Sequence, residues 1–418
     1  MLTKHVRVSE VFVPGGFPQV TYIAREEHQL ELRVKAANDN LSKLLVITGP
    51  TKSGKTVLVD KIFPQDSSIW IDGGTIGDEQ SFWDSVLERA ELFNTVEKNE
   101  GNELSGELSA EISAEGNIFI AKGGSSVSGT VHASSNTNSI YSRSVNSKIV
   151  AVNALRTQKI PLIIDDFHYI EKSVQKAIVR ALKSPIMHGL PVIFIAIPNR
   201  RYDAVEVERE MTGRIENVGM PVWTERELSE IANKGFDALN IGVRPELIFR
   251  LTSAAYGSPF LMQEFCKELC KRSEIEERST TRQFISEHID EADLFKEIAE
   301  HSGRSMFDKL KRGPRARTDR KARKLRNGSV TDIYGLVMEA LKNLQPGTES
   351  VSYDALRANM RDILDDELPQ KHEISRVLDK IAEISYTDAS STPVIDWQSE
   401  DGLLTITDPF FAFFLRWS

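Results

Sequence analysis

The stretch Gly49-Pro50-Thr51-Lys52-Ser53-Gly54-Lys55-Thr56 fits the pattern G-x-x-x-x-G-K-[ST] of a phosphate-binding loop, the P-loop. The apolar residues 44–47 before it predict a short buried strand, and residues 57–59 after it open a helix. A strand, a glycine turn and a helix N-terminus together point several backbone N–H groups at one place, where the helix dipole is also positive. The sequence therefore predicts a site for a triphosphate.

Each polar residue of this stretch has an expected role in binding ATP and Mg²⁺. Lys55 is expected to reach the β- and γ-phosphates, and the Thr56 hydroxyl to coordinate Mg²⁺. Gly49 and Gly54 allow backbone angles and close approaches that a Cβ would forbid. The expected nucleotide contacts run through Gly49, Pro50, Thr51, Lys52, Ser53, Gly54, Lys55, Thr56 and Val57.

A second apolar run, residues 160–164, predicts a buried strand that ends in two carboxylates, Asp165 and Asp166. A parallel strand delivers the residues at its carboxyl end to the same edge of the sheet as the P-loop. We expect Asp165 to hold Mg²⁺, directly or through water. Asp166 is expected to orient or deprotonate the attacking water. His168 either senses the nucleotide or is a polar residue at the start of a helix.

Two further positions follow from the predicted order of strands. The apolar run 191–197 predicts a central strand, and Asn199 and Arg200 just beyond its tip are candidates to face the γ-phosphate. Arg214 precedes a last predicted strand at 216–220. It either reaches the nucleotide of a neighbouring subunit as an arginine finger or forms a surface salt bridge.

Composition indicates a soluble globular protein of two or three domains. The chain has 418 residues, of which 40% are hydrophobic and 27% charged. No apolar run is long enough for a transmembrane helix, and the N-terminus lacks the apolar core of a signal peptide. Cys266 and Cys270 are expected to be packed thiols in a reducing compartment. We therefore expect a cytoplasmic protein without a membrane partner.

The predicted fold is an α/β P-loop NTPase with a parallel sheet and a helical lid, followed by an α+β winged-helix domain. The segment 96–145 is rich in Gly, Ser, Asn and Glu, and forms either short β-hairpins or a disordered insertion. Three helices at 331–344, 352–364 and 371–384, and a hairpin around Asp401-Gly402, suggest the winged helix. The expected divisions are an ATPase core at 1–222, a lid at 223–300, a basic linker at 301–328 and a winged helix at 329–418.

Positive charge is concentrated in residues 303–326, which hold eleven Lys and Arg side chains against two Asp side chains. Because the whole chain has a net charge of −9, this segment of +9 leaves −18 for the remainder. Such a concentration either attracts the phosphate backbone of DNA or pairs with the acidic remainder of the chain. Both interpretations stay open at this point.

These features together resemble the AAA+ superfamily and its STAND relatives, close to origin-recognition-like ATPases. The resemblance rests on the P-loop, residues 162–166, the polar tip at 199–200, the lid and the predicted winged helix. Gly257-Ser258-Pro259 and Asp165-Asp166-Phe167-His168 are similar to STAND signatures. The resemblance implies that Tyr22, Ile23 and Arg25 line the adenine pocket, with core packing as the alternative, and that Pro259 contacts the nucleotide.

The resemblance also implies a biological role. It suggests a slow ATPase switch that forms a homo-oligomer and engages DNA or a separate effector protein, since the chain shows no effector domain or sensing repeats of its own. Comparable ATPases suggest phage defence, that is antiviral defence, or a mobile element. The alternative is a nucleotide-stabilised DNA-binding regulator with negligible turnover.

Overall fold

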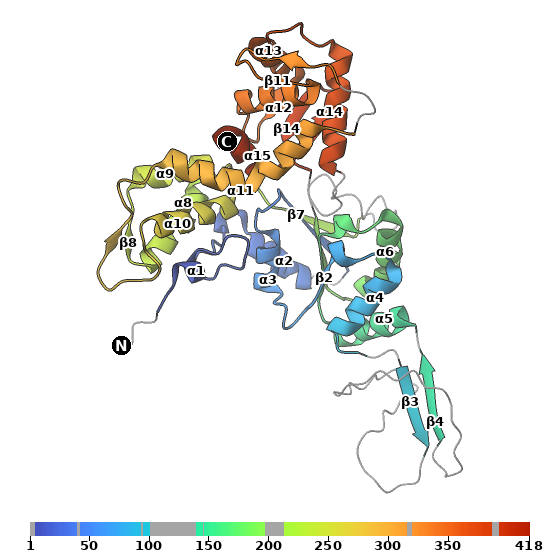
Figure 1. Cartoon of the computed structure of the whole chain (residues 1–418). Helices are drawn as coiled ribbons and strands as arrows, with labels where there is room; N and C mark the ends of the chain where they lie inside the picture. The colour runs from blue at the N-terminus through green and yellow to red at the C-terminus, as the bar shows by residue number, and fades with distance from the viewer. Residues whose placement is uncertain are drawn as a thin grey trace. The chain divides into compact units, whose positions relative to one another are not determined.

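The computed structural model describes residues 5–39, 42–92, 95–100, 139–144, 146–196, 213–315, 320–386 and 393–418. Contacts divide the chain into two compact units. The first, here called the P-loop unit, comprises residues 1–28, 49–57 and 220–418. The second, the sheet unit, comprises residues 29–48 and 58–219. Figure 1 labels helices and strands of both units.

The sheet unit is built on five parallel strands in the order β2-β5-β6-β1-β7 (Figure 1). Strands β1, β5 and β6 are the apolar runs predicted from sequence. They are buried in the interior of the sheet, as is usual for parallel strands that have both faces covered. The predicted α/β parallel sheet is thus confirmed. The strands are β1 (Leu44–Thr48), β2 (Ile69–Asp72), β5 (Leu162–Asp165), β6 (Val192–Ala196) and β7 (Ile215–Gly219).

Side chains alternate across this sheet because successive residues of a strand point to opposite faces. Leu44, Ile71, Ile164 and Phe194 belong to one core cluster with apolar side chains of α4, α5 and α6. The long helix α6 keeps its apolar stripe on this core, with Ile178 fully buried. The helices are α2 (Leu30–Asp39), α4 (Glu79–Arg89), α5 (Ser147–Gln158) and α6 (Lys172–Met187), with short helices η2 (Gly73–Thr75) and η3 (Phe167–Tyr169).

The insertion predicted at 96–145 is described only at its two ends. Strands β3 (Thr95–Glu100) and β4 (Ser139–Ser144) pair antiparallel. The two described ends of the insertion therefore agree with the β-hairpin alternative. Residues 101–138 lie outside the described residues, as do residues 197–212 with the candidates Asn199 and Arg200.

The P-loop unit contains the predicted helical lid. Helix α8 begins at a capping box, in which Thr224 accepts from the Glu227 N–H and Glu227 accepts from the Thr224 N–H. The long helix α11 continues without a break past residue 300, where the sequence suggested a linker. The first elements of this unit are α1 (Val8–Val11), η1 (Glu26–His28), the start of α3 (Lys55–Ile62), α8 (Glu225–Ala238), β8 (Ile241–Gly242), α9 (Pro245–Ala254), α10 (Pro259–Arg272), β9 (Gln283–Phe284) and α11 (Glu291–Arg312).

The C-terminal part of this unit has the three helices and the hairpin predicted from sequence. A third strand, β12, was missed because it is only three residues long with Ser at both ends; it pairs with β14. The assignment to a winged helix stays a prediction. The elements are β10 (Arg323–Lys324), β11 (Val330–Thr331), α12 (Ile333–Leu344), β12 (Ser350–Ser352), α13 (Tyr353–Ile363), α14 (Lys371–Tyr386), β13 (Ile395–Gln398), β14 (Leu403–Ile406) and α15 (Pro409–Trp417).

The aromatic helix α15 closes the core of the P-loop unit. Phe413 is fully buried, with its ring centroid 5.2 Å from that of Phe265 and 5.7 Å from that of Phe295. α11 lies directly against α15: a Cβ added at Gly303 would lie 2.2 Å from the Phe414 Cβ. The apolar side chains of α15 therefore form part of the core of this unit. No helix among the described residues is long and apolar enough to span a membrane.

Candidate nucleotide-binding site

The P-loop follows β1 directly and has two residues with positive φ. Lys52 has φ 58° and Gly54 φ 90°. A Cβ at Gly54 would meet no atom within 4 Å, so its backbone angle, and not crowding, favours glycine there. Gly49 is crowded instead, since a Cβ would lie 2.8 Å from the Cβ of Met220. The two glycines of the motif are thus needed for different physical reasons.

Three polar groups of the loop fit an anionic ligand. The hydroxyl oxygens of Thr51 and Ser53 are buried and have no hydrogen-bond partner among the described residues. Buried hydroxyls are normally paired, because desolvating them without a partner is costly. The Lys55 ammonium is buried as well, and it donates to the carbonyl oxygens of Gly49 (3.0 Å) and Pro50 (2.8 Å). Phosphate oxygens would satisfy the two hydroxyls and could accept a charge-assisted hydrogen bond from Lys55.

Residues 220–223 connect the P-loop to the lid. The indole N–H of Trp223 donates to the Ser53 carbonyl oxygen over 2.9 Å. Val222 lies beside the lid turn, where a Cβ on Gly257 (φ 70°) would come within 2.5 Å of its Cγ1. Pro259 follows as the first residue of α10, after the cap Ser258. The stretch Gly257-Ser258-Pro259 thus lies beside residues 220–223, which in turn contact the P-loop.

Arg25, one of the candidates for the adenine pocket, is engaged by groups of the protein itself. Its side chain is 2% exposed and forms a bidentate pair with Glu227, with Nε to Oε1 at 2.7 Å and Nη2 to Oε2 at 3.2 Å. It also donates to the carbonyl oxygens of Pro221 and Val222, and its guanidinium lies 4.5 Å from the Trp223 ring centroid. Arg25 thus joins the chain that precedes η1 to residues 221–227 at the start of α8. This set of contacts is called the Arg25 clamp below.

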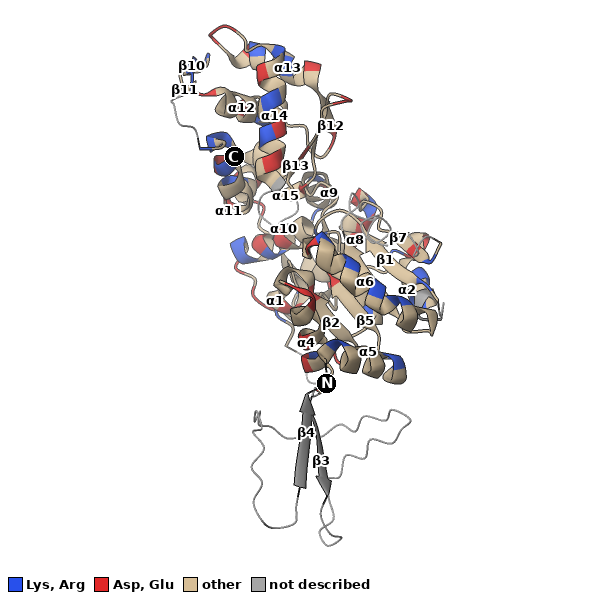
Figure 2. Ribbon diagram, turned by 90° about the vertical axis from the view of Figure 1, so that its right-hand side faces the viewer, with Lys and Arg blue, Asp and Glu red and all other residues tan. Residues whose placement is uncertain are grey.

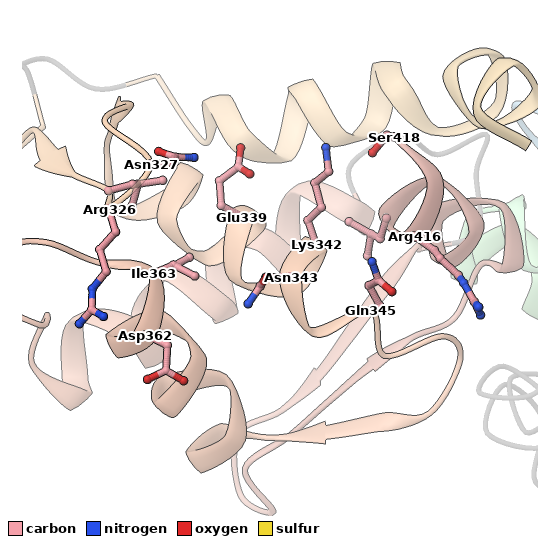
Figure 3. Close-up of a pocket in the computed structure, with 12 residues that line it drawn as sticks. Arg326, Asn327, Glu339, Lys342, Asn343, Gln345, Asp362, Ile363, Arg416 and Ser418 are labelled. Carbon is pink, nitrogen blue, oxygen red and sulfur yellow. The ribbon is translucent and has the colours of Figure 1, made fainter. Parts of the chain in front are cut away.

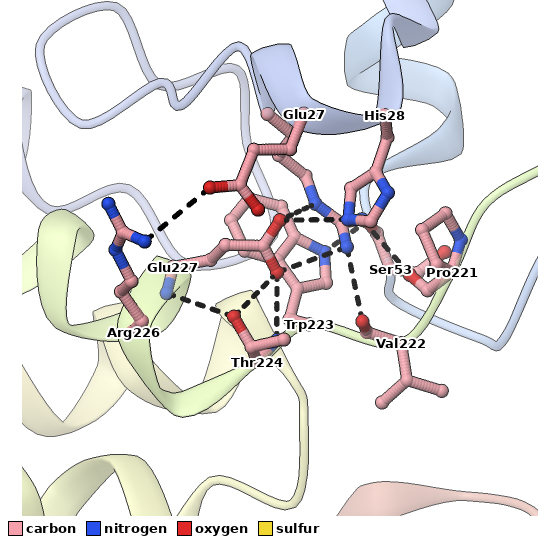
Figure 4. Close-up of polar contacts among 10 residues, drawn as sticks. Glu27, His28, Ser53, Pro221, Val222, Trp223, Thr224, Arg226 and Glu227 are labelled. Atoms are coloured by element: carbon pink, nitrogen blue, oxygen red, sulfur yellow. Dashed lines mark hydrogen bonds and ion pairs between the residues drawn. The ribbon is translucent and has the colours of Figure 1, made fainter.

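The carboxylate of this clamp is held ionised by its partners. Figure 4 shows Glu227 joined to Thr224 and His28, and Arg226 joined to Glu27. Burial opposes ionisation of Glu227, but hydrogen bonds from Arg25 and Thr224 outweigh it and keep its pKa below the ordinary value. Tyr22, the other adenine candidate, is half-buried, and its carbonyl oxygen accepts from Lys234 over 3.3 Å.

The two predicted acids lie at the end of β5 and directly after it, in the sheet unit. Asp165 is the last residue of the strand, and its Oδ1 accepts from the Asp166 N–H over 2.9 Å. Asp166 has φ 50° and leads into η3, where His168 packs on Tyr169. Since β5, β6 and β1 are parallel neighbours, Asp165 and Thr48 end their strands at the same edge of the sheet. The P-loop begins at the residue after Thr48.

Arg214 lies just before the edge strand β7. Its side chain is half-buried, and its carbonyl oxygen accepts from the Leu44 N–H over 2.8 Å. Its role toward a neighbouring subunit stays a prediction.

Solved structures share this architecture. A Walker-type ATPase of Pyrococcus abyssi is similar over 95% of this chain and 99% of its own, with 13% identity and a TM-score of 0.54. The fold is that of a P-loop ATPase. An ORC2 protein of Aeropyrum pernix, in ADPNP and ADP complexes, is similar over 97% of this chain and 96% of its own, with 12% identity and a TM-score of 0.48.

A STAND protein of Pyrococcus horikoshii with a tetratricopeptide repeat sensor is similar over 94% of this chain and 42% of its own, with 14% identity and a TM-score of 0.36. No protein-family model and no curated protein sequence matches this chain. The predicted P-loop ATPase fold is thus confirmed.

Within this ATPase fold, the P-loop has a contact that the sequence did not reveal. The Lys52 ammonium lies 3.5 Å from the ring centroid of Phe410 and 3.9 Å from the Asp408 carboxylate. Asp408 is the N-cap of α15 and accepts from the N–H groups of Phe410 and Phe411. Burial lowers the pKa of Lys52, while Asp408 acts in the opposite direction. Residues more than 350 positions apart thus meet, and no local sequence pattern could have indicated it.

Within the described part of residues 303–326, six basic side chains are engaged inside their own unit. They pair with carboxylates, or donate to backbone carbonyls, of neighbouring elements. Figure 2 shows both signs of charge side by side along α13 and α14. Of the two interpretations considered for residues 303–326, the contacts favour internal pairing. The contacts are Arg304 with Glu300 and Asp308, Lys311 with Glu339, Arg320 with Asp332, Lys324 with Asp365, Arg323 to the Glu367 carbonyl and Arg326 to the Leu364 carbonyl.

A groove of about 460 Å³ lies elsewhere in the P-loop unit, beside α12 and the end of α15 (Figure 3). Its charged lining residues are of both signs, and Figure 3 shows Arg326, Lys342 and Arg416 spread along it. Two of these cations are already engaged, Arg326 with the Leu364 carbonyl and Arg416 with the Tyr256 hydroxyl. The groove therefore lacks the convergent polar groups of a specific ligand site.

Proposed function

We propose that this protein binds ATP with Mg²⁺ at the P-loop, hydrolyses it slowly, and uses the nucleotide as a conformational switch. The observation that supports this best is the P-loop itself. It holds buried hydroxyls suited to phosphate, and it contacts both the lid, through Trp223, and the C-terminal helix α15, through Lys52. A loop that touches both elements is well placed to link its ligand to their positions.

The residues have distinct roles in this proposal. Lys55 binds the β- and γ-phosphates, with Thr51 and Ser53 as hydroxyl donors. Thr56 and Asp165 hold Mg²⁺, which neutralises charge on the phosphates when bound. Asp166 orients the attacking water. Asn199 and Arg200 are proposed γ-phosphate contacts, and Arg214 a contact across a homo-oligomer.

The output of the switch is proposed to be contact with a separate effector protein, and by analogy with STAND ATPases, antiviral defence. DNA binding by the predicted winged helix has less support. Residues 329–418 hold seven Lys and Arg against sixteen Asp and Glu, a net of −9, whereas a DNA-binding surface is expected to be basic. A DNA-binding regulator without turnover remains the second candidate. ATP hydrolysis measured with and without duplex DNA separates the two.

Nucleotide binding tests the core of the proposal. Wild type is expected to bind ATP and ADP and to release phosphate slowly, while Lys55→Ala should lose both activities. Lys61→Ala, a change to another lysine of α3 outside the motif, is the matched control and should retain both. Titration calorimetry and a phosphate-release assay measure these activities. Full nucleotide binding by Lys55→Ala would refute the assignment of the P-loop.

A further inference from the structure

We propose that Gly73 and Gln175 are positioning residues for Asp166, neither of them part of a recognised motif. The inference deepens the proposed function, because it rests on Asp166 acting on the attacking water. It is carried by contacts inside the sheet unit alone.

Gly73 lies where two strands bring their ends together. β2 and β5 are parallel, and Asp72 stands opposite Asp165 in the register. The next residue, Gly73, passes the Asp166 peptide so closely that a Cβ would lie 2.5 Å from the Asp166 carbonyl oxygen. The same Cβ would lie 2.9 Å from the carbonyl carbon and 3.0 Å from the Asp165 oxygen. All three are backbone atoms, so no side chain can rotate away. A methyl group here forces a shift of the chain that carries Asp166 or of the Gly73 segment packed on it.

Asp166 also needs support because of its own backbone. Its φ of 50° is in the left-handed region, which residues with a Cβ adopt only when their surroundings hold them there. Gln175, 1% exposed on α6, supplies that hold: its Nε2 donates to the carbonyl oxygens of Phe167 and Ile170, both at 3.0 Å. Phe167 in turn stacks on Phe194 of β6, with ring centroids 4.1 Å apart. The turn at Asp166 is therefore held by contacts from three sides: Gly73 directly after β2, Gln175 of α6 and Phe194 of β6.

The two residues are expected to affect catalysis and leave binding intact. A carboxylate that orients water must be placed within a fraction of an ångström, and a misplacement of about 1 Å can lower a rate about 100-fold. Lys55 and its neighbours lie in the P-loop unit and are unchanged in these variants. We therefore expect a loss in kcat with little change in KM or ADP affinity.

The experiment compares Gly73→Ala with Gly77→Ala. Gly77 is the matched control, since it lies on the same segment and a Cβ there would meet no atom within 4 Å. Gly73→Ala should lower kcat for ATP by about 10- to 100-fold, with ADP affinity within about twofold of wild type. Gly77→Ala should match wild type in both. Equal turnover of the two variants, or a parallel loss of ADP affinity in Gly73→Ala, would overturn the proposal.

A second variant guards against simple misfolding. Gln175→Met keeps the length of the side chain and removes both hydrogen-bond donors, so it should reproduce the loss in kcat at wild-type ADP affinity. A crystal structure of Gly73→Ala gives an independent readout. Displacement of the Asp166 peptide supports positioning, and an unmoved peptide refutes it. If wild type and Asp166→Asn are equally inactive toward ATP, the proposed function fails, and this structural comparison still decides the positioning of Asp166.

Discussion

At the scale of single residues, the two acids after β5 have neighbouring positions and different expected roles. Asp165 ends the strand, half-buried, whereas Asp166 lies in a left-handed turn. The first is placed to bind a cation and the second to act on water.

We expect Asp166→Asn to bind ATP and Mg²⁺ normally and to hydrolyse ATP at least about 100-fold more slowly, because the amide is a poor base. Asp165→Asn should instead weaken nucleotide binding only when Mg²⁺ is present. Titration calorimetry with and without EDTA, together with phosphate release, measures both. Unchanged turnover in Asp166→Asn would show that this carboxylate does not act on the water.

Arg25 offers a test at the same scale. Arg25→Ala leaves the Glu227 carboxylate, 14% exposed, without its bidentate partner, and should lower the free energy of unfolding by about 3 kcal/mol. Arg25→Lys restores the charge without the planar fork and should recover only part of this loss. Urea denaturation at neutral pH measures it. A variant as stable as wild type would mean that the clamp contributes nothing net.

At the scale of elements, the close packing of α11 against α15 requires a glycine at position 303. A Cβ at Gly303 would overlap Phe414, so Gly303→Ala should destabilise the protein by about 1–3 kcal/mol despite the higher helix propensity of alanine. Ser305→Ala, on the exposed side of α11, is the control and should be neutral or slightly stabilising. Thermal unfolding compares the two, and a stabilised Gly303→Ala would contradict the observed packing.

The elements also show how far the sequence alone could lead. The P-loop and the strand before Asp165 were predicted because each is a local pattern. The pairing of Arg25 with Glu227 had no local signal, because the two residues lie 202 positions apart in the chain. Gly73 gave no signal, since a lone glycine after a strand is common and its neighbour becomes evident only from strand register. Non-local contacts therefore account for what the sequence could not reveal.

At the scale of the whole molecule, we expect the described part of the basic segment to contribute mainly to stability. Arg323 is 4% exposed and Arg320 pairs with Asp332 at 2.6 Å, whereas Arg315 and Lys321 are exposed. Arg320→Gln with Arg323→Gln should lower the free energy of unfolding by about 2 kcal/mol, and Arg315→Gln with Lys321→Gln by less than about 0.5 kcal/mol.

Neither pair of substitutions should alter the affinity for duplex DNA at any salt concentration of a titration. If the segment did bind DNA, the slope of log affinity against log salt would fall by about 0.9 for each phosphate that a variant no longer neutralises. A drop of this size in the exposed pair would restore the nucleic-acid interpretation of the segment. A drop in stability confined to the Arg320 and Arg323 pair would support internal pairing.

The contact of Lys52 with Phe410 and Asp408 has a thermodynamic consequence that runs in both directions. If nucleotide binding weakens this contact, then any partner that withdraws α15 must change nucleotide affinity by the same factor by which nucleotide changes the affinity for that partner. An effector that binds the C-terminal helix and withdraws it would thus raise the affinity for nucleotide and slow its release without approaching the phosphates. The last helix of the chain would then set how long each nucleotide stays bound.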